Sequence, residues 1–571
     1  MIPEAYFVDF VQELKSRPLT KQQIQHLKTV LCKRHHVANI PTEIDLITHA
    51  KQEDLAFLKT KLLSKPTRTL SGVAPIAIMS YPFRCPHGAC LYCPSKTVQG
   101  VPQSYTGPEP AVRRATRNFF DPYLQVMNRL EQYAVQGHNF DKVDIIIMGG
   151  TFPSFQKRYK DNFIKNVFKA LNDFSRLFYD GKNFKQEAFK TFFELPGSIN
   201  DEERATRIHH KLMSVKMNTI ATIEAEQEYN DFSSAIKCIG LTIETRSDNG
   251  KLLHGLEMLR YGCTRVELGI QSVYNDVLIK IGRAHTAQDN IDSIRILKDL
   301  GFKLNFHMMP GLPFVSREED LAGLKLLFED ERYRPDMLKI YPCMVVRESG
   351  LFSLWKAGKF IPMTTVEAAD MISEFKRSIP EYCRIMRVQR DIPTYMTRAG
   401  VDQTNLRQVL DEVMKKKGIV CKCIRCRESG RLMHHADQEI GVKVTHYKAS
   451  GGDEFFISAE DGNVLYGFVR MRFPSQPRRQ EFTDSSAIIR ELHVYGLAQS
   501  INDSSLISEG SQGELIAQHR GLGKLLMQKA EQIAKDFNRN KLLVIAGVGV
   551  RGYYRKLGYA SEGPYMSKMI P

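Results

Sequence analysis

The sequence predicts an α/β protein in which a parallel sheet with crossover helices, either an open sheet or a full or partial (β/α) barrel, carries a helical N-terminal extension and a separate C-terminal α+β domain. Three observations support this fold class. The chain has 571 residues, which is too long for a single hydrophobic core. In its middle part, short apolar runs alternate with amphipathic segments, as in a parallel sheet with crossover helices. After about residue 435 the strand-like segments become longer and alternate between apolar and polar residues, which indicates an antiparallel sheet.

Residues 1–70 are expected to form helices. Several of their apolar residues lie near helical spacing: Leu14, Leu19, Ile24, Leu27, Val30 and Leu31. Lysine and arginine outnumber acidic residues in this segment by eleven to seven. The simpler interpretation is a solvated helical face, and the sharper hypothesis is an accessory nucleic-acid-binding module.

Residues 71–395 are expected to form the barrel. Six apolar runs predict its strands: 72–79, 143–148, 240–244, 265–270, 303–309 and 337–341. Residues 156–235 are expected to be a charged, helical and peripheral insertion. In barrels the chemistry collects at the carboxyl ends of the strands. At those ends the sequence has Gly149-Gly150-Thr151, Glu244-Thr-Arg246, Gln271-Ser272 and Pro310-Gly311.

Residues 396–435 are interpreted as a linker and residues 436–571 as the C-terminal domain. Strands are expected at 442–447, 464–471, 488–494 and 542–546, and a helix is expected from Gly521. This order predicts an antiparallel sheet with a few helices.

Composition and charge limit the classes of function. Lysine and arginine number 80 against 64 acidic residues, a net charge of +16 with a pI near 9.2, which favours a polyanionic partner such as nucleic acid. No apolar run approaches the roughly 18 residues of a membrane helix, and the N-terminus has no signal-peptide pattern. We therefore expect a cytoplasmic protein without a membrane span. Because export is not expected, disulfides are improbable among the eleven cysteines. The six that form two clusters are better explained as metal or cluster ligands, and the five scattered ones as small hydrophobic residues.

The motif Cys85-Pro-His-Gly-Ala-Cys90-Leu-Tyr-Cys93 follows the first expected strand. Three thiolates in a tight loop can hold three irons of a four-iron cluster. No cysteine occurs between Cys93 and Cys238, so one iron would remain open to a small molecule. Two alternatives remain at this point: a plant-type ferredoxin site, which needs a fourth cysteine, and a zinc site completed by His87.

A second cysteine motif, Cys421-Lys-Cys423-Ile-Arg-Cys426, lies on the basic linker. Closely spaced thiolates suggest zinc, which requires four ligands in a structural site. The candidates for the fourth ligand are Cys383, Cys343, His434 and His435. The alternative is a reduced cysteine cluster without a metal.

The third motif, Gly521-Leu522-Gly523-Lys524, opens the C-terminal helix. Glycines at a helix N-terminus allow backbone N–H groups to approach a pyrophosphate. By itself such a pair is more often a simple turn. Its context strengthens the hypothesis, because a strand with Glu491, Leu492, His493 and Val494 precedes it and Tyr553-Tyr554 follows. The alternative for these two tyrosines is packing on a helix face.

The first cysteine motif resembles the loop of the radical S-adenosylmethionine (SAM) enzymes. This resemblance implies a partial or full (β/α) barrel with a [4Fe–4S] cluster whose open iron binds the amino and carboxylate groups of SAM. It also implies that Gly149, Gly150 and Thr151 form a glycine-rich turn beside the methionine amino group. The order of elements after residue 436 is similar to the acetyl-CoA-dependent N-acetyltransferase fold, in which a tyrosine at the position of Tyr554 protonates or binds the CoA sulfur.

The two domains together resemble the Elongator catalytic-subunit family of tRNA wobble-uridine modifying enzymes, over nearly the whole chain. The matching segments are Pro66–Gly72, Gln103–Gly107, Ile147–Phe152, Gly240–Arg246, Tyr261–Arg265, His307–Pro310, Leu338–Pro342, Arg387–Asp391, Glu491–Gly496 and Gly563–Met566. Two segments depart from the family pattern: Cys93-Pro-Ser-Lys96 replaces Cys-Pro-Gly-Gly, and Gly282-Arg-Ala-His285 replaces Gly-Arg-Gly-His. The short gap between Cys85 and Cys90 points to a prokaryotic member.

The family resemblance implies 5-carboxymethylation of uridine 34 in the tRNA anticodon loop from acetyl-CoA. A deoxyadenosyl radical would take hydrogen from the acetyl methyl, the carbon radical would add to C5 of uridine, and water would release CoA. Acetyl-CoA would contact Lys142, Glu491–Val494, Gly521–Lys524 and Tyr554, with Lys142 and Tyr554 in catalytic roles. Residues 1–70 would be a basic, tRNA-binding extension, and the enzyme would act alone or as a homo-oligomer.

Two rival functions remain open. One is a protein lysine acetyltransferase in which the iron–sulfur cluster is structural, and the other is a degenerate scaffolding subunit. The intact cysteines and glycine loop argue against degeneracy. From the residues alone, the simpler interpretation of Lys142 is an exposed lysine without a catalytic role.

Overall fold

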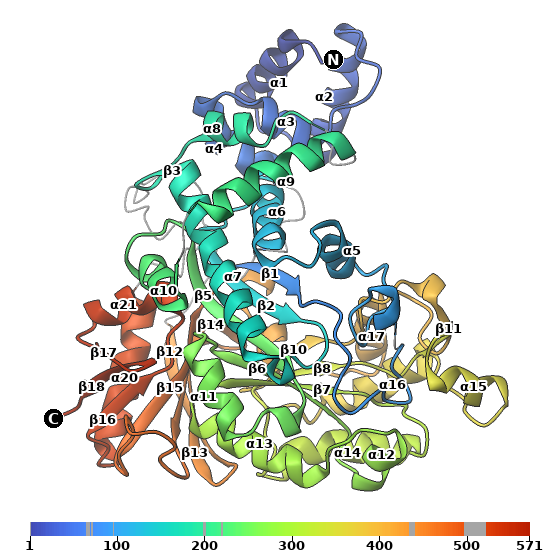
Figure 1. Cartoon of the computed structure of the whole chain (residues 1–571), viewed down its shortest axis with the longest axis vertical. Coiled ribbons are helices and arrows are strands. Elements are labelled where there is room, and N and C mark those ends of the chain that lie inside the picture. The colour runs from blue at the N-terminus through green and yellow to red at the C-terminus, as the bar shows by residue number, and fades with distance from the viewer. Residues whose placement is uncertain are drawn as a thin grey trace.

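The structure is a computed structural model and describes residues 2–63, 69, 72–94, 96–197, 201–218, 221–432, 440–495 and 521–571. Figure 1 shows three parts: helices of the N-terminal extension at the top, the barrel in the centre, and the C-terminal domain in orange and red at the lower left. Among the described residues, no helix has the length and apolar character needed to cross a membrane.

The central sheet has seven strands that pair in chain order. They are β1 (Ala74–Met79), β2 (Lys142–Met148), β5 (Lys237–Thr245), β6 (Arg265–Gln271), β7 (Lys303–Met308), β8 (Met337–Ile340) and β10 (Arg384–Arg387). Every neighbouring pair is parallel. Because each strand pairs with the next one, the sheet keeps winding in one direction and curls into a half-barrel. The predicted partial barrel is confirmed, although the sequence did not reveal β10.

Helices cover the outer face of this sheet: α6 (Pro122–Val135), α7 (Lys157–Phe178), α11 (Leu252–Arg260), α13 (Ala287–Asp299), α14 (Arg317–Glu329) and α16 (Thr365–Lys376). Three of them begin with a reciprocal capping box, formed by Thr286 with Asp289, Ser316 with Glu319, and Thr364 with Glu367. Each box satisfies two backbone N–H groups of the first turn and so determines where the helix starts. The expected helix at 290–300 is α13.

The segment 156–235 is helical as predicted, but its first helix is not peripheral. The side chains of Phe163, Ile164 and Phe168 on α7 are at most 2% exposed and belong to the main core, because α7 is the crossover helix between β2 and β5. The rest of the segment comprises β3 (Tyr179–Asp180), β4 (Asn183–Phe184), α8 (Gln186–Phe192), α9 (Glu202–Met217) and α10 (Ile223–Phe232). Helix α8 reaches the N-terminal extension, where Lys190 Nζ donates to the Ala50 carbonyl at 3.1 Å.

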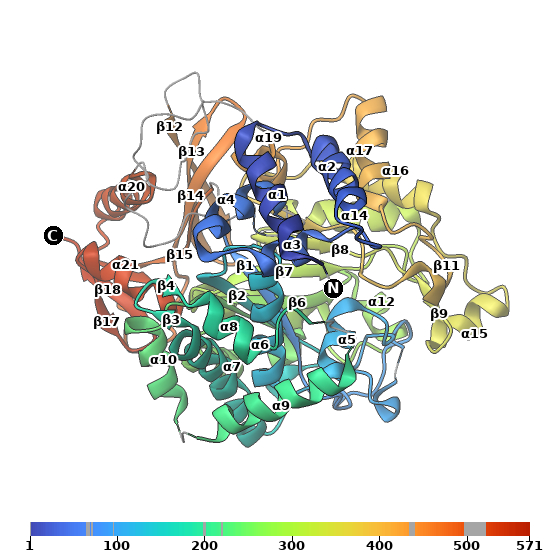
Figure 2. The ribbon, with the colours of Figure 1, turned by 90° about the horizontal axis from the view of Figure 1, so that it is seen from above.

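The extension consists of α1 (Glu4–Ser16), α2 (Lys21–Arg34), α3 (Glu43–His49) and α4 (Gln52–Leu62), which confirms its helical character. Its helices enclose a small core of their own, centred on Tyr6, Phe10, Leu31 and Leu46. Seen from above, the extension lies over the centre of the molecule (Figure 2).

Short elements complete the barrel and the connection to the C-terminal domain. They are α5 (Pro110–Arg117), α12 (Asn275–Lys280), β9 (Val345–Val346), α15 (Gly350–Lys356), β11 (Thr397–Ala399), α17 (Leu406–Lys416), α18 (Ile424–Arg427) and α19 (Ser429–Leu432). Leu406 and Leu410 of α17 are fully buried in the main core. The predicted linker 396–435 therefore contains a helix that packs with the barrel.

The C-terminal domain contains a second seven-stranded sheet, in the order β12-β13-β14-β15-β16-β18-β17. Its strands are β12 (Gly441–Ala449), β13 (Gly452–Asp461), β14 (Val464–Phe473), β15 (Ser486–Val494), β16 (Lys541–Val544), β17 (Ala560–Glu562) and β18 (Tyr565–Met569), and its helices are α20 (Leu522–Asp536) and α21 (Arg551–Lys556). The predicted antiparallel sheet is wrong in one place, since β15 and β16 pair in parallel because α20 forms a crossover between them.

Strands β15 and β16 separate part-way along their length. Residues 486–489 of β15 pair with β16, whereas Glu491–Val494 pair only with β14. The register between β14 and β15 shifts at Arg490, an extra residue that bulges out of the ladder. The separated strands on either side of α20 agree with the expected N-acetyltransferase-like arrangement.

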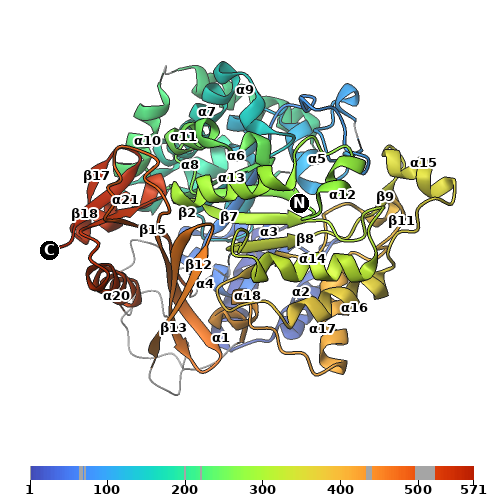
Figure 3. The ribbon, with the colours of Figure 1, turned by 90° about the horizontal axis from the view of Figure 1, so that it is seen from below.

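The two large domains are joined by buried charges. Arg472 Nη2 of β14 donates to Asp299 Oδ1 of α13 at 2.6 Å, and Lys298 Nζ lies 3.6 Å from Glu454 Oε1; these four side chains are at most 1% exposed. The backbones also approach closely, since a Cβ added to Gly547 would stand 2.0 Å from the Ile239 carbonyl oxygen. Figure 3 shows the C-terminal sheet directly beside the barrel.

Candidate active site

The first cysteine motif forms a loop immediately after β1. The side chains of Cys85, Cys90 and Cys93 are all buried. Each sulfur has a polar partner: Cys85 Sγ lies 3.6 Å from Thr151 Oγ1, Cys90 Sγ lies 3.3 Å from His87 Nε2, and Cys93 Sγ accepts from Gln103 Nε2 at 3.5 Å. The loop therefore presents three thiols on the barrel side, and a contact with a neighbouring polar side chain holds each sulfur in place.

The spacing of these sulfurs suits a cluster better than a single ion. Among the described residues, two groups place three or more candidate ligand atoms within 4.8 Å of one another, and the set Cys85, Cys90 and Cys93 is not one of them. Sulfurs around one zinc, at about 2.3 Å from the metal, would lie that close. A four-iron cluster instead places each thiolate on a different iron. This arrangement disfavours the zinc alternative with His87.

Burial and neighbouring arginines act in opposite directions on the thiols of the loop. Burial raises the pKa of the Cys85 and Cys93 thiols, so without a metal these two groups would stay protonated. Arg283 Nη1 lies 3.7 Å from Cys90 Sγ, and its Nη2 donates to the Gly269 carbonyl at 2.6 Å. This buried guanidinium supplies positive charge beside Cys90 and near Cys85, and Arg390 does so for Cys93, which stabilises thiolates.

The glycine-rich turn follows β2 and faces the cysteine loop. Gly149 and Gly150 have φ angles of +100° and +68°, which favour glycine. A Cβ on Gly149 would also stand 2.9 Å from Ser80 Oγ. Both glycines line the interior of the barrel, where the missing side chains leave the backbone accessible to a ligand.

A cavity of about 330 Å³ fills the barrel between this turn, the cysteine loop and the strand ends. We call it the lumen cavity. Glu267, 1% exposed, accepts a hydrogen bond from His307 Nε2 at 2.7 Å and another from Lys339, whose ammonium also donates to Glu244 at 3.2 Å. Burial disfavours the negative charge of Glu267. The Lys339 ammonium and His307 outweigh this effect and hold the pKa of Glu267 well below its usual range.

Sequence reasoning missed the trio Glu267, His307 and Lys339. These residues lie on β6, β7 and β8 and become neighbours only through strand pairing. Gln271, at the end of β6, adds a polar atom to the cavity, because its buried Oε1 has no hydrogen-bond partner among the described residues. An unpartnered buried acceptor inside a cavity is the kind of group that a bound ligand satisfies.

A second cavity, of about 230 Å³, lies at the opposite end of the barrel. We call it the interdomain cavity, because β14 and β15 of the C-terminal domain form one wall through Phe468, Arg470, Glu491, His493 and Tyr495. The two cavities share lining residues, namely Pro75, Ile146, Arg265 and Met386. They therefore meet inside the barrel, where Arg265 Nη2 donates to Asp144 at 2.7 Å.

The predicted CoA residues on β15 divide between two faces. Glu491 and His493 line the interdomain cavity, while Leu492 and Val494 pack against the C-terminal core. Burial lowers the pKa of His493 to about 4, so the ring is neutral, and its Nε2 has no partner among the described residues. Only half of the predicted segment can therefore reach a ligand in this cavity.

The glycines of the third motif lie at the start of α20. Gly521 is its N-cap, with φ +78°. A Cβ on Gly523 would stand 2.7 Å from Tyr553 Oη and 3.9 Å from a methyl carbon of Val494. Leu522 is buried and Lys524 is exposed. The helix N-terminus, Tyr553 and the end of β15 thus meet at one place, as a pyrophosphate site requires.

The two residues predicted to be catalytic are not among the residues that line the lumen or the interdomain cavity. Tyr554 is 7% exposed and packs in the C-terminal core, where burial and the neighbouring Tyr553 raise its pKa. Lys142, at the start of β2, is not among the residues that line either cavity, and burial lowers its pKa. The tyrosine that touches the start of α20 is Tyr553.

The second cysteine motif is compact. The sulfurs of Cys421, Cys423 and Cys426 lie within 4.8 Å of one another. The sulfurs of Cys383 and Cys343 do not belong to this group, and His434 and His435 lie outside the described residues. The site thus offers three of the four ligands that a structural zinc requires.

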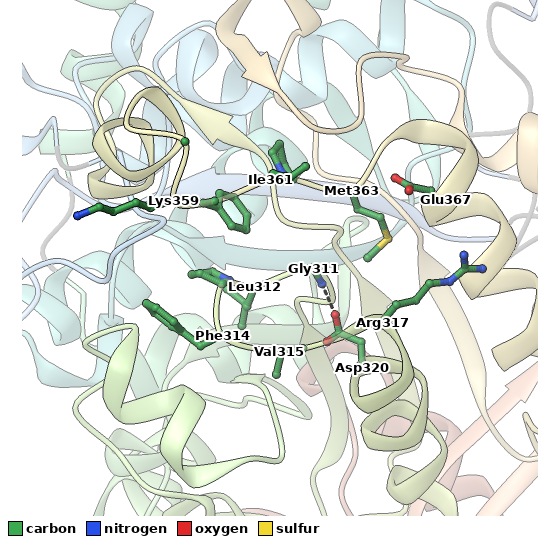
Figure 4. Close-up of a pocket in the computed structure, with 14 residues that line it drawn as sticks. Gly311, Leu312, Phe314, Val315, Arg317, Asp320, Lys359, Ile361, Met363 and Glu367 are labelled. Atoms are coloured by element: carbon green, nitrogen blue, oxygen red, sulfur yellow. Dashed lines mark hydrogen bonds between the residues drawn. The ribbon is translucent and has the colours of Figure 1, made fainter.

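A third cavity, of about 450 Å³, opens between the loop after β7 and the loop between α15 and α16 (Figure 4). Leu312, Phe314 and Ile361 line it. Asp320, inside it, accepts a hydrogen bond from the Gly311 N–H at 2.6 Å. Burial raises the pKa of Asp320 to about 7. This cavity shares no lining residue with the lumen cavity.

A curled parallel sheet, a three-cysteine loop after its first strand and a glycine turn after its second define a radical SAM enzyme. Comparison with protein families agrees: residues 79–324 match the Radical SAM superfamily, residues 335–416 match the Radical_SAM C-terminal domain, and residues 7–70 match the ELP3 N-terminal domain.

Similar proteins cover nearly the whole chain. The tRNA uridine(34) acetyltransferase of Methanocaldococcus infernus is 38% identical over 97% of both chains, and Elongator complex protein 3 of Saccharomyces cerevisiae is 38% identical over 99% of this chain and 95% of its own. The solved structure of the archaeal Methanocaldococcus infernus Elp3 with an N-terminus deletion (1–46) superposes with a TM-score of 0.70, at 35% identity, covering 88% of this chain and 100% of that chain. The chain belongs to the Elongator complex protein 3 (Elp3) family.

Proposed function

We propose that this enzyme forms 5-carboxymethyluridine at position 34 of tRNA from acetyl-CoA and SAM. The observation that carries the proposal is the contact of two cavities inside one barrel. The lumen cavity lies beside the cysteine loop, and the interdomain cavity is walled by the C-terminal domain. The names of the relatives, tRNA uridine(34) acetyltransferase and Elongator complex protein 3, support the substrate.

The residues present fit the implied cofactors. Cys85, Cys90 and Cys93 would hold a [4Fe–4S] cluster, which when reduced supplies the electron that cleaves SAM in this superfamily. Gly149, Gly150 and Thr151 would accept the methionine part of SAM, since a side chain at position 149 would fill the space beside Ser80. Gln271 Oε1 is a free acceptor in the same cavity.

Acetyl-CoA would bind with its pyrophosphate at Gly521–Lys524 and its acyl end toward the interdomain cavity. The neutral His493 ring, with a free Nε2, and the Glu491 carboxylate, which accepts from Arg470 Nε at 2.9 Å, would orient the thioester. Tyr554 and Lys142 remain proposals for catalytic roles, because neither lines a cavity in this structure.

The remaining parts of the proposal concern partners. The net charge of +16 supports binding of a tRNA anticodon loop whose base enters the barrel. Zinc at Cys421, Cys423 and Cys426 is proposed on their compact spacing. A cytoplasmic enzyme that acts alone or as a homo-oligomer is the corresponding expectation.

Mass spectrometry of tRNA nucleosides tests the function. Protein reconstituted anaerobically with iron and sulfide is incubated with tRNA, SAM, a reductant and acetyl-CoA, and the digest is searched for carboxymethyluridine. The matched control omits acetyl-CoA. Acetyl-lysine on a protein substrate with unmodified tRNA would instead favour the lysine acetyltransferase.

A further inference from the structure

Three aromatic side chains, Tyr81, Phe83 and Phe120, lie together at the protein surface beside the cysteine loop, and the exposed Phe119 adjoins them in the chain. We call Tyr81, Phe83, Phe119 and Phe120 the aromatic rim. Tyr81 and Phe83 lie between β1 and Cys85, whereas the two phenylalanines follow α5. The Tyr81 ring centroid lies 5.2 Å from that of Phe83 and 6.1 Å from that of Phe120. Tyr81, Phe83 and Phe119 are 53%, 38% and 71% exposed, so large apolar faces point to solvent.

The aromatic rim adjoins the lumen cavity. The Phe83 carbonyl oxygen would stand 3.8 Å from a Cβ on Gly150, which lines that cavity. One side of the rim is anchored, because the Phe83 ring packs against Tyr159 with centroids 5.1 Å apart, and Tyr159 Oη accepts the Tyr81 N–H at 2.8 Å. The rim is therefore a fixed surface at the place where a substrate reaches the cysteine loop.

The backbone after α5 is strained in a way that exposes aromatic rings. Phe119 and Phe120 have φ angles of +55° and +56°, the left-handed region that glycine usually occupies after a helix. The conformation is held by N–H bonds from Phe120 to the Ala115 carbonyl at 2.8 Å and from Phe119 to the Thr116 carbonyl at 3.1 Å. The Phe119 ring contacts His209 of α9 with ring centroids 5.4 Å apart, yet most of its side chain stays in solvent. Retained strain of this kind is typical of functional sites.

Positive charge surrounds the aromatic rim. Arg84 follows Phe83 directly, and Arg113 and Arg117 lie on α5; all three are exposed. Within the part of the chain that the structure describes, none of these guanidinium groups forms an ion pair. Exposed rings interleaved with unpaired arginines are the surface that single-stranded nucleic acid requires, because bases stack on the rings while the arginines neutralise phosphates.

We propose that the aromatic rim is a stacking platform for unpaired nucleobases that flank the target uridine, holding the RNA loop open at the entrance of the lumen cavity. This inference rests on the proposed function, since it assigns the RNA substrate a binding surface. RNA is the better occupant, because its bases stack on the exposed rings while its phosphates pair with the three arginines.

The test measures the affinity of the holoenzyme for two synthetic RNAs. One is a hairpin with an unpaired loop, and the other is a continuous duplex with the same stem. The variants are Tyr81→Ala/Phe119→Ala and Tyr81→Leu/Phe119→Leu; the second keeps apolar area but no π face. We expect both to bind the hairpin about tenfold more weakly per lost ring and to bind the duplex as wild type does. Iron content and SAM cleavage without RNA are the folding controls, because neither depends on these side chains.

Phe232→Ala is the matched control, since Phe232 is 65% exposed on α10, on the other side of the molecule from α5 (Figures 1 and 2). A direct readout uses the single tryptophan, Trp355: in a Trp355→Phe background, a Tyr81→Trp variant should lose fluorescence with the hairpin and not with the duplex.

Unchanged hairpin affinity in the alanine variant, or equal losses for hairpin and duplex, would overturn the platform whether or not carboxymethyluridine forms. Full hairpin affinity in the leucine variant would do the same. Rim-dependent hairpin binding without any modified uridine would instead refute the proposed function.

Discussion

Arg490 of the C-terminal domain and Asp336 of the barrel form an ion pair with both side chains fully buried. Arg490 Nη1 donates to Asp336 Oδ1 at 3.0 Å, and its Nη2 binds the second carboxylate oxygen. Although burial disfavours its charge, Asp336 has a pKa far below the usual range, because Arg490 and Lys298 stabilise the carboxylate. Arg490 is also the bulged residue of β15, so the pair ties the separation of β15 and β16 to the barrel.

Asp336→Ala should lower the free energy of unfolding by about 3 kcal/mol, because it leaves Glu454 as the one remaining carboxylate partner of the buried Arg490 and Lys298 among the described residues. Urea denaturation measures the change. Lys280→Ala is the control, since it removes an ion pair to Asp276 in which both side chains are at least half exposed, worth at most about 1 kcal/mol. Similar losses in the two variants would show that the pair does not join the domains.

Asp320 should make stability depend on pH. Its folded pKa of about 7 exceeds the unfolded value of about 3.9, so the folded state holds an extra proton between about pH 4 and 7. Stability should fall as pH rises through that window, by at most about 1.4 kcal/mol per pH unit, and then level off. Asp320→Asn should therefore gain melting temperature relative to wild type as the pH rises from 5 to 8. A difference in melting temperature between the variant and the wild type that stays constant with pH would contradict the raised pKa of Asp320.

Gly523→Val should weaken acetyl-CoA binding by about tenfold or more, because the new side chain would occupy the space between Tyr553 Oη and Val494 at the start of α20. Isothermal titration of acetyl-CoA measures the affinity. Gly441→Val is the matched control, at an edge strand where the nearest atom to an added Cβ is 4.0 Å away. Tyr554→Phe should keep the acetyl-CoA affinity in this titration and should also keep its iron content. It should lower the yield of carboxymethyluridine in the tRNA nucleoside assay, and a full yield would remove Tyr554 from the reaction.

Deleting residues 1–62 should weaken tRNA binding and reduce its dependence on salt. Each phosphate contact that is lost removes roughly 0.7–0.9 from the slope of log affinity against log salt. Binding at two salt concentrations, for the full chain and the deletion, measures both effects. The extension has a core separate from that of the barrel, so iron content should persist. Equal affinity and equal slope in a deletion that keeps its iron would mean that the extension only packs on the barrel.

Local motifs were predictable from the sequence, and contacts between distant segments were not. The cysteine loop and the Gly149-Gly150 turn are short segments whose geometry depends on their own residues, and the structure places both at the lumen cavity. Glu267, His307 and Lys339 come from three strands and carry no pattern of their own. Strand β10, Arg-Ile-Met-Arg, was missed because charged residues flank its short apolar centre.

The family resemblance predicted more of the fold than of the CoA site. Lys142 and Tyr554 came from matching positions in the sequence, but the exact lining of a cavity depends on strand separation and helix packing. That is why Tyr553, one residue away, contacts Gly523 while Tyr554 turns into the core. The helical insertion was misjudged for a similar reason, since charged residues on the outer face of α7 conceal a buried face.

In the proposed reaction, the cysteine loop and the C-terminal domain act together on one uridine. The most direct measurement follows isotope from methyl-labelled acetyl-CoA into tRNA nucleosides, with 5′-deoxyadenosine counted in the same reaction, for wild type and for Cys90→Ala/Cys93→Ala. We expect labelled carboxymethyluridine at position 34 and deoxyadenosine from the wild type, and neither product from the variant. Labelled uridine from the cysteine variant, or deoxyadenosine without any labelled uridine from the wild type, would contradict it.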